Sequence, residues 1–201
     1  MNEKKQRILD VGLIEFSEHS YENASLNKII EQADLSKGTF YHYFKDKMDL
    51  YLTLVNVCID KKSDYINSNP DKRYKYDLSD DFFETIKKQM LFNIGFLKQE
   101  PVFYKFSVHI SSEDEQVKAS IREKHGWRLD GGVDDMIDAA YLKGEFDTKY
   151  PKGFVKNVLN HLFKHYYYLL FPEDKDISPE AIEATLDLYY DFLKSGFSSK
   201  E

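Results

Sequence analysis

The stretch LSKGTFYHYFKDKMDLY, residues 35–51, decides how this sequence folds. Ser36 is a good N-cap residue placed directly before a short segment, which predicts a helix over residues 37–43. Asp46 stands in the same position before the next segment, and Asp49 follows three residues later, where the positive end of a helix favours a carboxylate. We therefore expect two helices joined by a tight connection.

The sequence before this stretch predicts two further helices. Residues 3–18 place four apolar side chains on one helical face: Ile8, Leu9, Leu13 and Phe16. Ser25 can cap the second helix, in which apolar residues fall at positions i, i+3, i+4 and i+7: Leu26, Ile29, Ile30 and Ala33. Short helices in this order, joined by tight turns, make a helix-turn-helix unit.

The helix over residues 37–43 has two different sides. The inward set is aromatic and can pack on the preceding helices: Phe40, Tyr43 and Phe44. The outward set combines hydrogen-bond donors, one methyl group and rings with polar tips: Lys37, Gly38, Thr39, Tyr41 and His42. Gly38 costs about 1 kcal/mol relative to alanine in a helix interior, but its bare backbone lets another surface come close. Such a side suits base edges and phosphates in the major groove of DNA.

The rest of the chain also has helical patterns, so we predict an all-α protein. A helix runs from Asp46 to about Ile66, and a polar linker containing Pro70 follows over residues 67–78. The later start and stop signals are a Ser79 cap before a long helix, a break at Pro101, a start at Ser112, a helix from Gly131-Gly132 to Gly144, a helix over residues 153–171, and one from the Ser178-Pro179 cap to Gly196.

The composition limits the classes of protein that fit. The 201-residue chain carries a net charge of −7, and residues 1–50 hold seven basic against nine acidic residues. An acidic chain repels DNA at long range, so a phosphate contact has to be local; residues 36–47 hold three lysines against one aspartate. The single Cys58 excludes an internal disulfide, and no segment approaches the about 18 apolar residues of a membrane helix. We expect a cytoplasmic protein with no membrane contact.

Patterns for catalysis or metal binding are weak. His161 and His165 stand four residues apart on a predicted helix, but no third ligand lies near them in the sequence, and no phosphate-binding loop or dinucleotide motif occurs. We expect no metal, no cofactor and no enzymatic activity. Two alternatives stay open: an all-helical enzyme, for which no clustered catalytic set is present, and a helix-turn-helix fold used only for protein contacts.

The segment from about Arg7 to Leu54 resembles the TetR family of bacterial transcriptional regulators. The resemblance rests on ILDVGLIEFSEHSYENASLNKIIEQADLSKGTFYHYFKDKMDLY, within which SKGTFYHYFKDK is the most specific part. It implies an N-terminal three-helix DNA-binding domain, residues 1–48, and a C-terminal helical ligand-binding and dimerisation domain, residues 49–201. It also implies contacts with DNA from seven positions: Ser25, Lys37, Gly38, Thr39, Tyr41, His42 and Lys47.

Two of these positions would meet phosphates at helix ends, Ser25 at the start of the second helix and Lys47 at the start of the fourth. The sequence departs from the family pattern at two places. Ser20 stands where the family usually has a glycine, and we expect it to be a less favourable C-cap of the first helix. Asp49 stands where the family often has a glutamate, which is a mild change.

The second half of the chain carries hypotheses about a pocket and a dimer. Eight side chains are candidates to line a cavity for an apolar, planar or cationic compound: Phe92, Phe96, Phe103, Tyr104, Phe106, His109, Trp127 and Tyr141. The helices over residues 153–171 and 179–197 have more apolar positions than one contact within a chain would cover, which predicts a homodimer with Leu186 in the contact; the resemblance implies a dimer too. A two-fold dimer binds a palindromic operator, from which we expect a small-molecule effector to release it.

Overall fold

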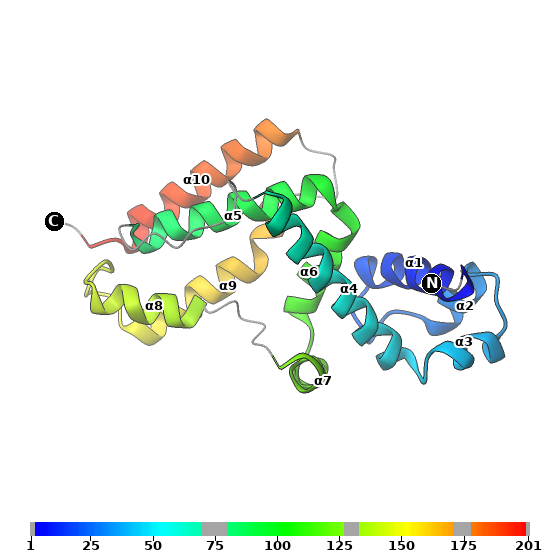
Figure 1. Cartoon of the computed structure of the whole chain (residues 1–201). Helices are drawn as coiled ribbons and strands as arrows, with labels where there is room; N and C mark the ends of the chain where they lie inside the picture. Colours follow the sequence, from blue (N-terminus) through cyan, green and yellow to red (C-terminus); the bar gives the residue numbers. More distant parts are fainter. Residues whose placement is uncertain (1–2, 70–79, 127–132, 171–177, 200–201) are drawn as a thin grey trace. The chain divides into compact units, whose positions relative to one another are not determined.

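The computed structural model describes residues 3–69, 80–126, 133–170 and 178–199. These residues form helices in the following order (Figure 1): α1 (Glu3–Glu18), α2 (Leu26–Gln32), α3 (Lys37–Tyr43), α4 (Lys47–Ser68), α5 (Phe82–Gln99), α6 (Pro101–Ser112), α7 (Glu115–His125), α8 (Val133–Leu142), α9 (Lys152–Leu170) and α10 (Pro179–Phe197). Within the described ranges, every helix is too short or too polar to span a lipid bilayer. The chain packs as two compact units, residues 1–71 with 95–129 and residues 72–94 with 130–201.

Side-chain caps fix where the first helices begin. Three predicted N-caps are in place, each accepting from the backbone N–H three residues later: Ser25 (from Lys28, 3.3 Å), Ser36 (from Thr39, 3.1 Å) and Asp46 (from Asp49, 2.8 Å). These bonds satisfy amide groups that the first turn of a helix leaves open. The predicted all-α class and the three N-terminal helices are confirmed.

The first unit is built around α1, which packs on α2, α4 and α6. Its core contains one ring from each of three helices: Phe16 of α1 lies 5.0 Å from Tyr51 of α4, and Tyr51 lies 5.4 Å from Phe106 of α6, both edge to face. Gly12 lets α1 approach α4, because a Cβ there would lie 3.2 Å from a methyl carbon of Leu50. The packing of α6 thus belongs to the same core as the N-terminal helices.

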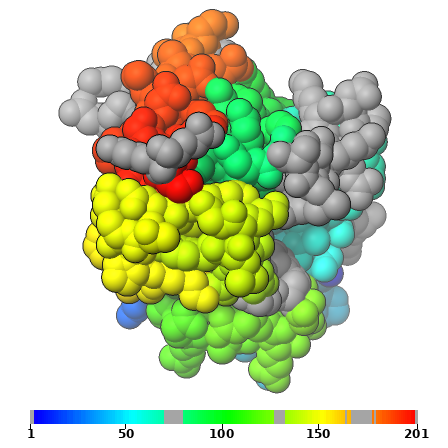
Figure 2. Space-filling model, turned by 90° about the vertical axis from the view of Figure 1, so that its left-hand side faces the viewer, coloured from blue at the N-terminus to red at the C-terminus, as the bar shows by residue number. Residues whose placement is uncertain are grey.

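The second unit has an apolar core formed by α5, α8, α9 and α10. Figure 2 shows the face where the yellow region formed by α8 and α9 lies beside the red C-terminal part of α10. Two backbone bonds tie this end of α10 to the segment after α8: Asp147 N–H donates to Phe197 O at 2.8 Å, and Ser199 N–H donates to Glu145 O at 3.0 Å. Phe146, between these bonds, is 2 % exposed and holds the junction in the core.

Two predicted helix boundaries are wrong. Ser112 is the last residue of α6, and its hydroxyl donates to His109 O at 3.0 Å. The cap of α7 is Asp114, which accepts from Val117 N–H at 2.9 Å. Gly196 lies inside α10, which continues to Phe197. A helical glycine marks an end only when the chain turns left-handed there, and Gly196 does not have a positive φ.

The left-handed positions are elsewhere. Among the described non-glycine residues, Asp34 has a positive φ of 53°, in the turn between α2 and α3. Ser20 does not have a positive φ, and the expectation that it is a less favourable C-cap than glycine stays a prediction. Gly144 does have the predicted left-handed conformation, with a φ of 74°.

Several predicted signals lie outside the described residues: Ser79, Trp127, Gly131, Gly132 and most of the linker over 67–78. Within the described part, Asp81 caps α5 by accepting from Glu84 N–H at 2.7 Å. The division into residues 1–48 and 49–201 concerns function rather than packing, and it stays a prediction.

Candidate nucleic-acid interface

α3 has one buried side and one exposed side. Phe40 is fully buried, and Phe44, directly after the helix, is 2 % exposed. On the other side Tyr41 is 56 % exposed, with its ring edge-on to Phe40 at 5.3 Å. Lys37, Gly38 and His42 are also exposed, and Thr39 is half-buried. The buried rings therefore hold the helix in the first unit while polar and aromatic groups face outward.

Gly38 has open space around it. A Cβ built at this position would meet no atom nearer than Ser36 Oγ, at 3.8 Å. Packing within the chain therefore does not require a glycine here, and the bare backbone is available to an external surface. Ser36 Oγ also lies 3.0 Å from Thr39 Oγ1, so the hydroxyl of Thr39 takes part in the cap.

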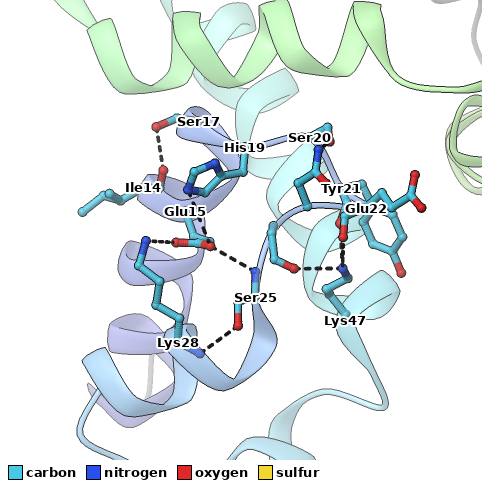
Figure 3. Close-up of polar contacts among 12 residues, drawn as sticks. Ile14, Glu15, Ser17, His19, Ser20, Tyr21, Glu22, Ser25, Lys28 and Lys47 are labelled. Atoms are coloured by element: carbon cyan, nitrogen blue, oxygen red, sulfur yellow. Dashed lines mark hydrogen bonds and ion pairs between the residues drawn. The ribbon is translucent and has the colours of Figure 1, made fainter.

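A buried carboxylate holds the start of α2 against α1 (Figure 3). Glu15, 2 % exposed, accepts from Ser25 N–H at 3.0 Å, and one of its oxygens lies 2.6 Å from Lys28 Nζ. Burial alone would raise the pKa of Glu15, but the Lys28 ammonium and the Ser25 N–H outweigh it, so the pKa lies below its usual value. The backbone N–H of Ser25, a predicted phosphate donor, is thus already used within the protein.

Lys47 binds the turn between α1 and α2 (Figure 3). Its ammonium donates to the backbone carbonyls of Tyr21 at 2.6 Å, Ala24 at 2.9 Å and Glu22 at 3.3 Å, and it lies 4.5 Å from the centre of the Tyr21 ring. An ammonium has three N–H donors, so these carbonyls use all of them. Burial lowers the pKa of the Lys47 ammonium below its usual value. A phosphate contact from Lys47 stays a prediction; in this structure its role is to hold the turn.

Glu113 binds the same turn. No sequence pattern predicted a role for this residue. It follows α6 directly and is 6 % exposed. Its Oε1 accepts from Tyr21 N–H at 2.7 Å and from the Tyr51 hydroxyl at 3.2 Å. Burial raises the pKa of the Glu113 carboxyl above its usual value. The only sequence signal was the acidic run Glu113-Asp114-Glu115, which also fits an ordinary helix start, and no local pattern connects it to Tyr21.

His109, one turn before the end of α6, lies against the end of α1. It is half-buried, and it makes a hydrogen bond with the backbone of Ser17 next to His19. Burial, together with the neighbouring His19, lowers the pKa of His109 below its usual value. His109 was predicted to line a ligand cavity; that role stays a prediction, and in this structure the side chain contacts the end of α1.

The predicted cavity residues are divided between the two units. Five lie in the first unit: Phe96, Phe103, Tyr104, Phe106 and His109. Of these, Phe106 is fully buried between Phe16 and Tyr51, and Phe96 packs on Tyr65 at 5.5 Å. Phe92 and Tyr141 lie in the second unit. The described residues thus show these side chains as packing partners, and the effector pocket stays a prediction.

A small depression in the second unit is lined by none of the predicted residues. Its walls are Asp80, Phe82, Thr85, Met136, Ala139, Ala140, Lys143 and Glu145. In the part of the chain that the structure describes, no group of three or more histidine, cysteine, aspartate or glutamate side chains could hold a metal ion. The rings of His161 and His165 lie 4.3 Å apart on α9, and His165 Nδ1 is 2.7 Å from the backbone oxygen of His161.

Known proteins are similar to this chain in the region that includes α3 and its exposed side. The family model described as "Bacterial regulatory proteins, tetR family" matches residues 8–54, from α1 into α4. The helix-turn-helix regulator YuxN of Bacillus subtilis is 36 % identical over 61 residues, 30 % of this chain and 21 % of that protein. IcaR of Staphylococcus epidermidis, a negative regulator of the biofilm operon icaADBC, is 26 % identical over 118 residues, 59 % of each chain. This chain spans less than two thirds of either relative.

Solved structures extend the likeness of fold to the whole chain. A TetR-family regulator from Chloroflexus aurantiacus superposes with a TM-score of 0.73 at 23 % identity, covering 98 % of this chain and 94 % of that one. A TetR-like regulator from Rhodococcus superposes with a TM-score of 0.59 at 15 % identity, covering 96 % and 94 %. The N-terminal helices and the exposed side of α3 define a helix-turn-helix protein. The match over residues 8–54 makes these helices similar to those of TetR-family regulators, and the whole chain shares the fold of the solved regulators.

Proposed function

We propose that the protein is a DNA-binding transcriptional regulator, not an enzyme, and that α3 enters the major groove. The observation that carries the proposal is the division of α3 into a side fixed by buried rings and an exposed side with Lys37, Tyr41 and His42 around the open backbone of Gly38. A recognition helix has to be held rigidly while its outer side contacts base edges and phosphates. Lys45, also exposed, adds positive charge directly after the helix.

The role of Lys47 in this proposal is indirect. Because its ammonium is bonded to the carbonyls of the turn between α1 and α2, it orients the start of α2 instead of reaching freely toward a phosphate. Ser25 acts in the same region as the cap of α2. We assign the direct contacts to the residues of α3.

The proposed active form is a homodimer that binds a palindromic operator. On α10, Leu188 is 71 % exposed and Phe192 is 64 % exposed, one helical turn apart, and Phe154 on α9 is 50 % exposed. Exposed apolar side chains of this size are typical of an interface. In a two-fold dimer, α9 and α10 of a second copy would bury them. Leu186, predicted to lie in the contact, is 1 % exposed and belongs to the core of its own chain, so that prediction is wrong.

Regulation by a small molecule completes the proposal. The regulator acts as a repressor in the cytoplasm, as IcaR is a negative regulator, and an effector bound in the helical second domain releases it from the operator. The effector can act only through its preference for the conformation that does not bind DNA, and the operator weakens effector binding by the same factor. The 22-residue helix α4 leaves the DNA-reading helices as one continuous element and can carry such a change.

The test is selection of DNA by the wild-type protein from a random duplex library, followed by titration of the selected duplex. Lys37→Ala should weaken binding by about tenfold and, where Lys37 meets a phosphate, lower the salt dependence by about one charge. Lys143→Ala, at an exposed position directly after α8, removes the same charge and is the matched control.

Two results would contradict the proposal. One is a wild-type protein that selects no sequence, which would favour a helix-turn-helix used for protein contacts. The other is equal binding by the Lys37→Ala and Lys143→Ala variants, which would remove α3 from the interface.

A further inference from the structure

The turn between α1 and α2 is held from outside the three DNA-reading helices by one buried carboxylate. Glu113 follows the last residue of α6, and its Oε1 accepts from Tyr21 N–H at 2.7 Å. The same oxygen accepts from the Tyr51 hydroxyl of α4 at 3.2 Å. A hydrogen bond to a buried charged acceptor is strong and directional, so it restricts both the position and the orientation of the Tyr21 peptide.

α6 is attached to this part of the unit at more than one point. Phe106, three residues before His109, packs on Phe16 of α1 and Tyr51 of α4. His109 bonds to the backbone of Ser17 at the end of α1. Phe106 packs on the rings of α1 and α4, and His109 and Glu113 make polar contacts one to two turns further along. With these contacts in place, α6 cannot slide or rotate along α1 without breaking the bond to Tyr21.

The position of this turn determines where α2 begins. Through α2 it also determines the orientation of α3. Tyr21 is followed within four residues by Ser25, the cap of α2, whose own N–H is fixed by Glu15 of α1. Ile29 of α2 is fully buried in the same core as Phe40 of α3. A displacement of the turn therefore moves α2 and the base of α3 together, because close-packed interiors transmit displacement.

We propose that Glu113 is a positioning residue for DNA binding: it joins the end of α6 to the turn between α1 and α2, so that the orientation of α6 sets the orientation of α3. The inference rests on the proposed function and names a contact that holds the DNA-reading helices in place. This contact reaches α2 directly and is separate from the continuity of the chain along α4.

The experiment compares three variants in the full-length protein. Glu113→Ala removes the acceptor oxygen, while Glu113→Gln keeps an oxygen at the same place for Tyr21 N–H. Glu115→Ala is the matched control, since it removes an equal charge two residues later, where the side chain is 78 % exposed. Binding is measured to the duplex that the wild-type protein selects from a random library and to an unrelated duplex of equal length.

Glu113→Ala should weaken binding to the selected duplex by about tenfold or more and change binding to the unrelated duplex no more than Glu115→Ala does. Glu113→Gln should restore most of the lost affinity. Hydrogen exchange supplies a readout that general loss of stability would not give: the Tyr21 amide should exchange faster in Glu113→Ala, while amides of α10 keep their wild-type rates.

Each contrary outcome has a distinct meaning. A wild-type protein that selects no duplex overturns the proposed function and this inference with it. Selection by the wild type, with Glu113→Ala binding as tightly as Glu115→Ala, overturns the inference alone. Equal losses in Glu113→Ala and Glu113→Gln, or unchanged exchange at Tyr21, would also overturn it, because the bond from Tyr21 N–H would then not be the cause.

Discussion

Both compact units have an apolar core, and they differ in the buried charged groups that bind backbone atoms. In the first unit, buried charged groups bind backbone atoms: Glu15 and Glu113 accept from N–H groups at either end of one turn, and Lys47 donates to carbonyls between them. In the second unit, the core is formed by apolar side chains, and the buried Tyr189 hydroxyl has no hydrogen-bond partner among the residues that the structure describes. Directional bonds fix angles, whereas apolar packing is non-directional.

This difference matches the task proposed for each unit. A helix that enters the major groove has to be oriented closely enough for several side chains to reach base edges together, and three charged side chains on one turn achieve this. An effector-binding and dimerisation unit has to accept a change of arrangement. Apolar side chains can repack at a smaller energetic cost than buried charged groups that are hydrogen-bonded to the backbone.

The largest effect is expected where the second unit leaves apolar groups uncovered. Leu188→Glu should weaken dimer formation by about a hundredfold, because two-fold symmetry places like charges near each other in a desolvated contact. Sedimentation equilibrium measures it. Leu142→Glu, at a position 91 % exposed on α8, is the control and should leave the dimer intact. A Leu188→Glu protein with the dimer constant of the control would remove α10 from the interface.

An intermediate effect should separate the two units through a matched pair of tyrosines. Tyr51→Phe removes a hydroxyl bonded to Glu113 and should lower the free energy of unfolding by about 1–2 kcal/mol. Tyr189→Phe removes a buried hydroxyl without a partner, so it should leave the stability unchanged or raise it by up to about 1 kcal/mol. Urea unfolding gives both values. If both variants lowered the free energy of unfolding equally, the two hydroxyl groups would contribute equally to stability, and the contrast between the units would be wrong.

The smallest effect is a pH dependence from His109. Its pKa in the folded protein is lowered from 6.5 by burial and by His19, so the unfolded chain takes up the proton first as the pH falls. The contribution of neutral His109 to the free energy of unfolding is therefore complete above pH 6.5 and declines as the pH falls below it.

The measurement compares the wild type with His109→Gln, since the difference cancels groups common to both proteins, including Glu15 and Glu113. The stability of the wild type relative to the variant should fall between pH 7.5 and 5.5, because the lowered pKa of His109 makes the unfolded chain bind the proton first. A difference that stays constant, or rises, over this range would show that His109 is not held neutral against α1.

The sequence predicted those features of the fold that depend on neighbouring residues. The caps at Ser36 and Asp46 follow from a side chain reaching an amide three residues away, and the alternation of buried and exposed positions on α3 follows from helical geometry. Lys47 and Glu113 could not be assigned in this way, because they contact Tyr21 across 26 and 92 residues. A phosphate-binding lysine and a turn-binding lysine at the start of a helix look identical in sequence.

The aromatic residues of the second half show the same limit. Phe106 was a candidate to line a cavity, and it fills the core between Phe16 and Tyr51. A phenylalanine contributes the same apolar surface in either setting, and only its neighbours in space distinguish them. On α10, helical periodicity identified both apolar sides but could not tell which one, Leu186 or Leu188, is covered by the chain itself.

The open space above Gly38 bears on how such a protein can acquire a new target. No atom of the chain would obstruct a side chain at this position, and replacing a helical glycine by alanine favours the helix by about 0.5–1 kcal/mol. If α3 binds DNA as proposed, Gly38→Ala alters the surface offered to the DNA without weakening the fold. In that case binding preference and stability are uncoupled at this residue, and one substitution can change the preference while the protein stays folded.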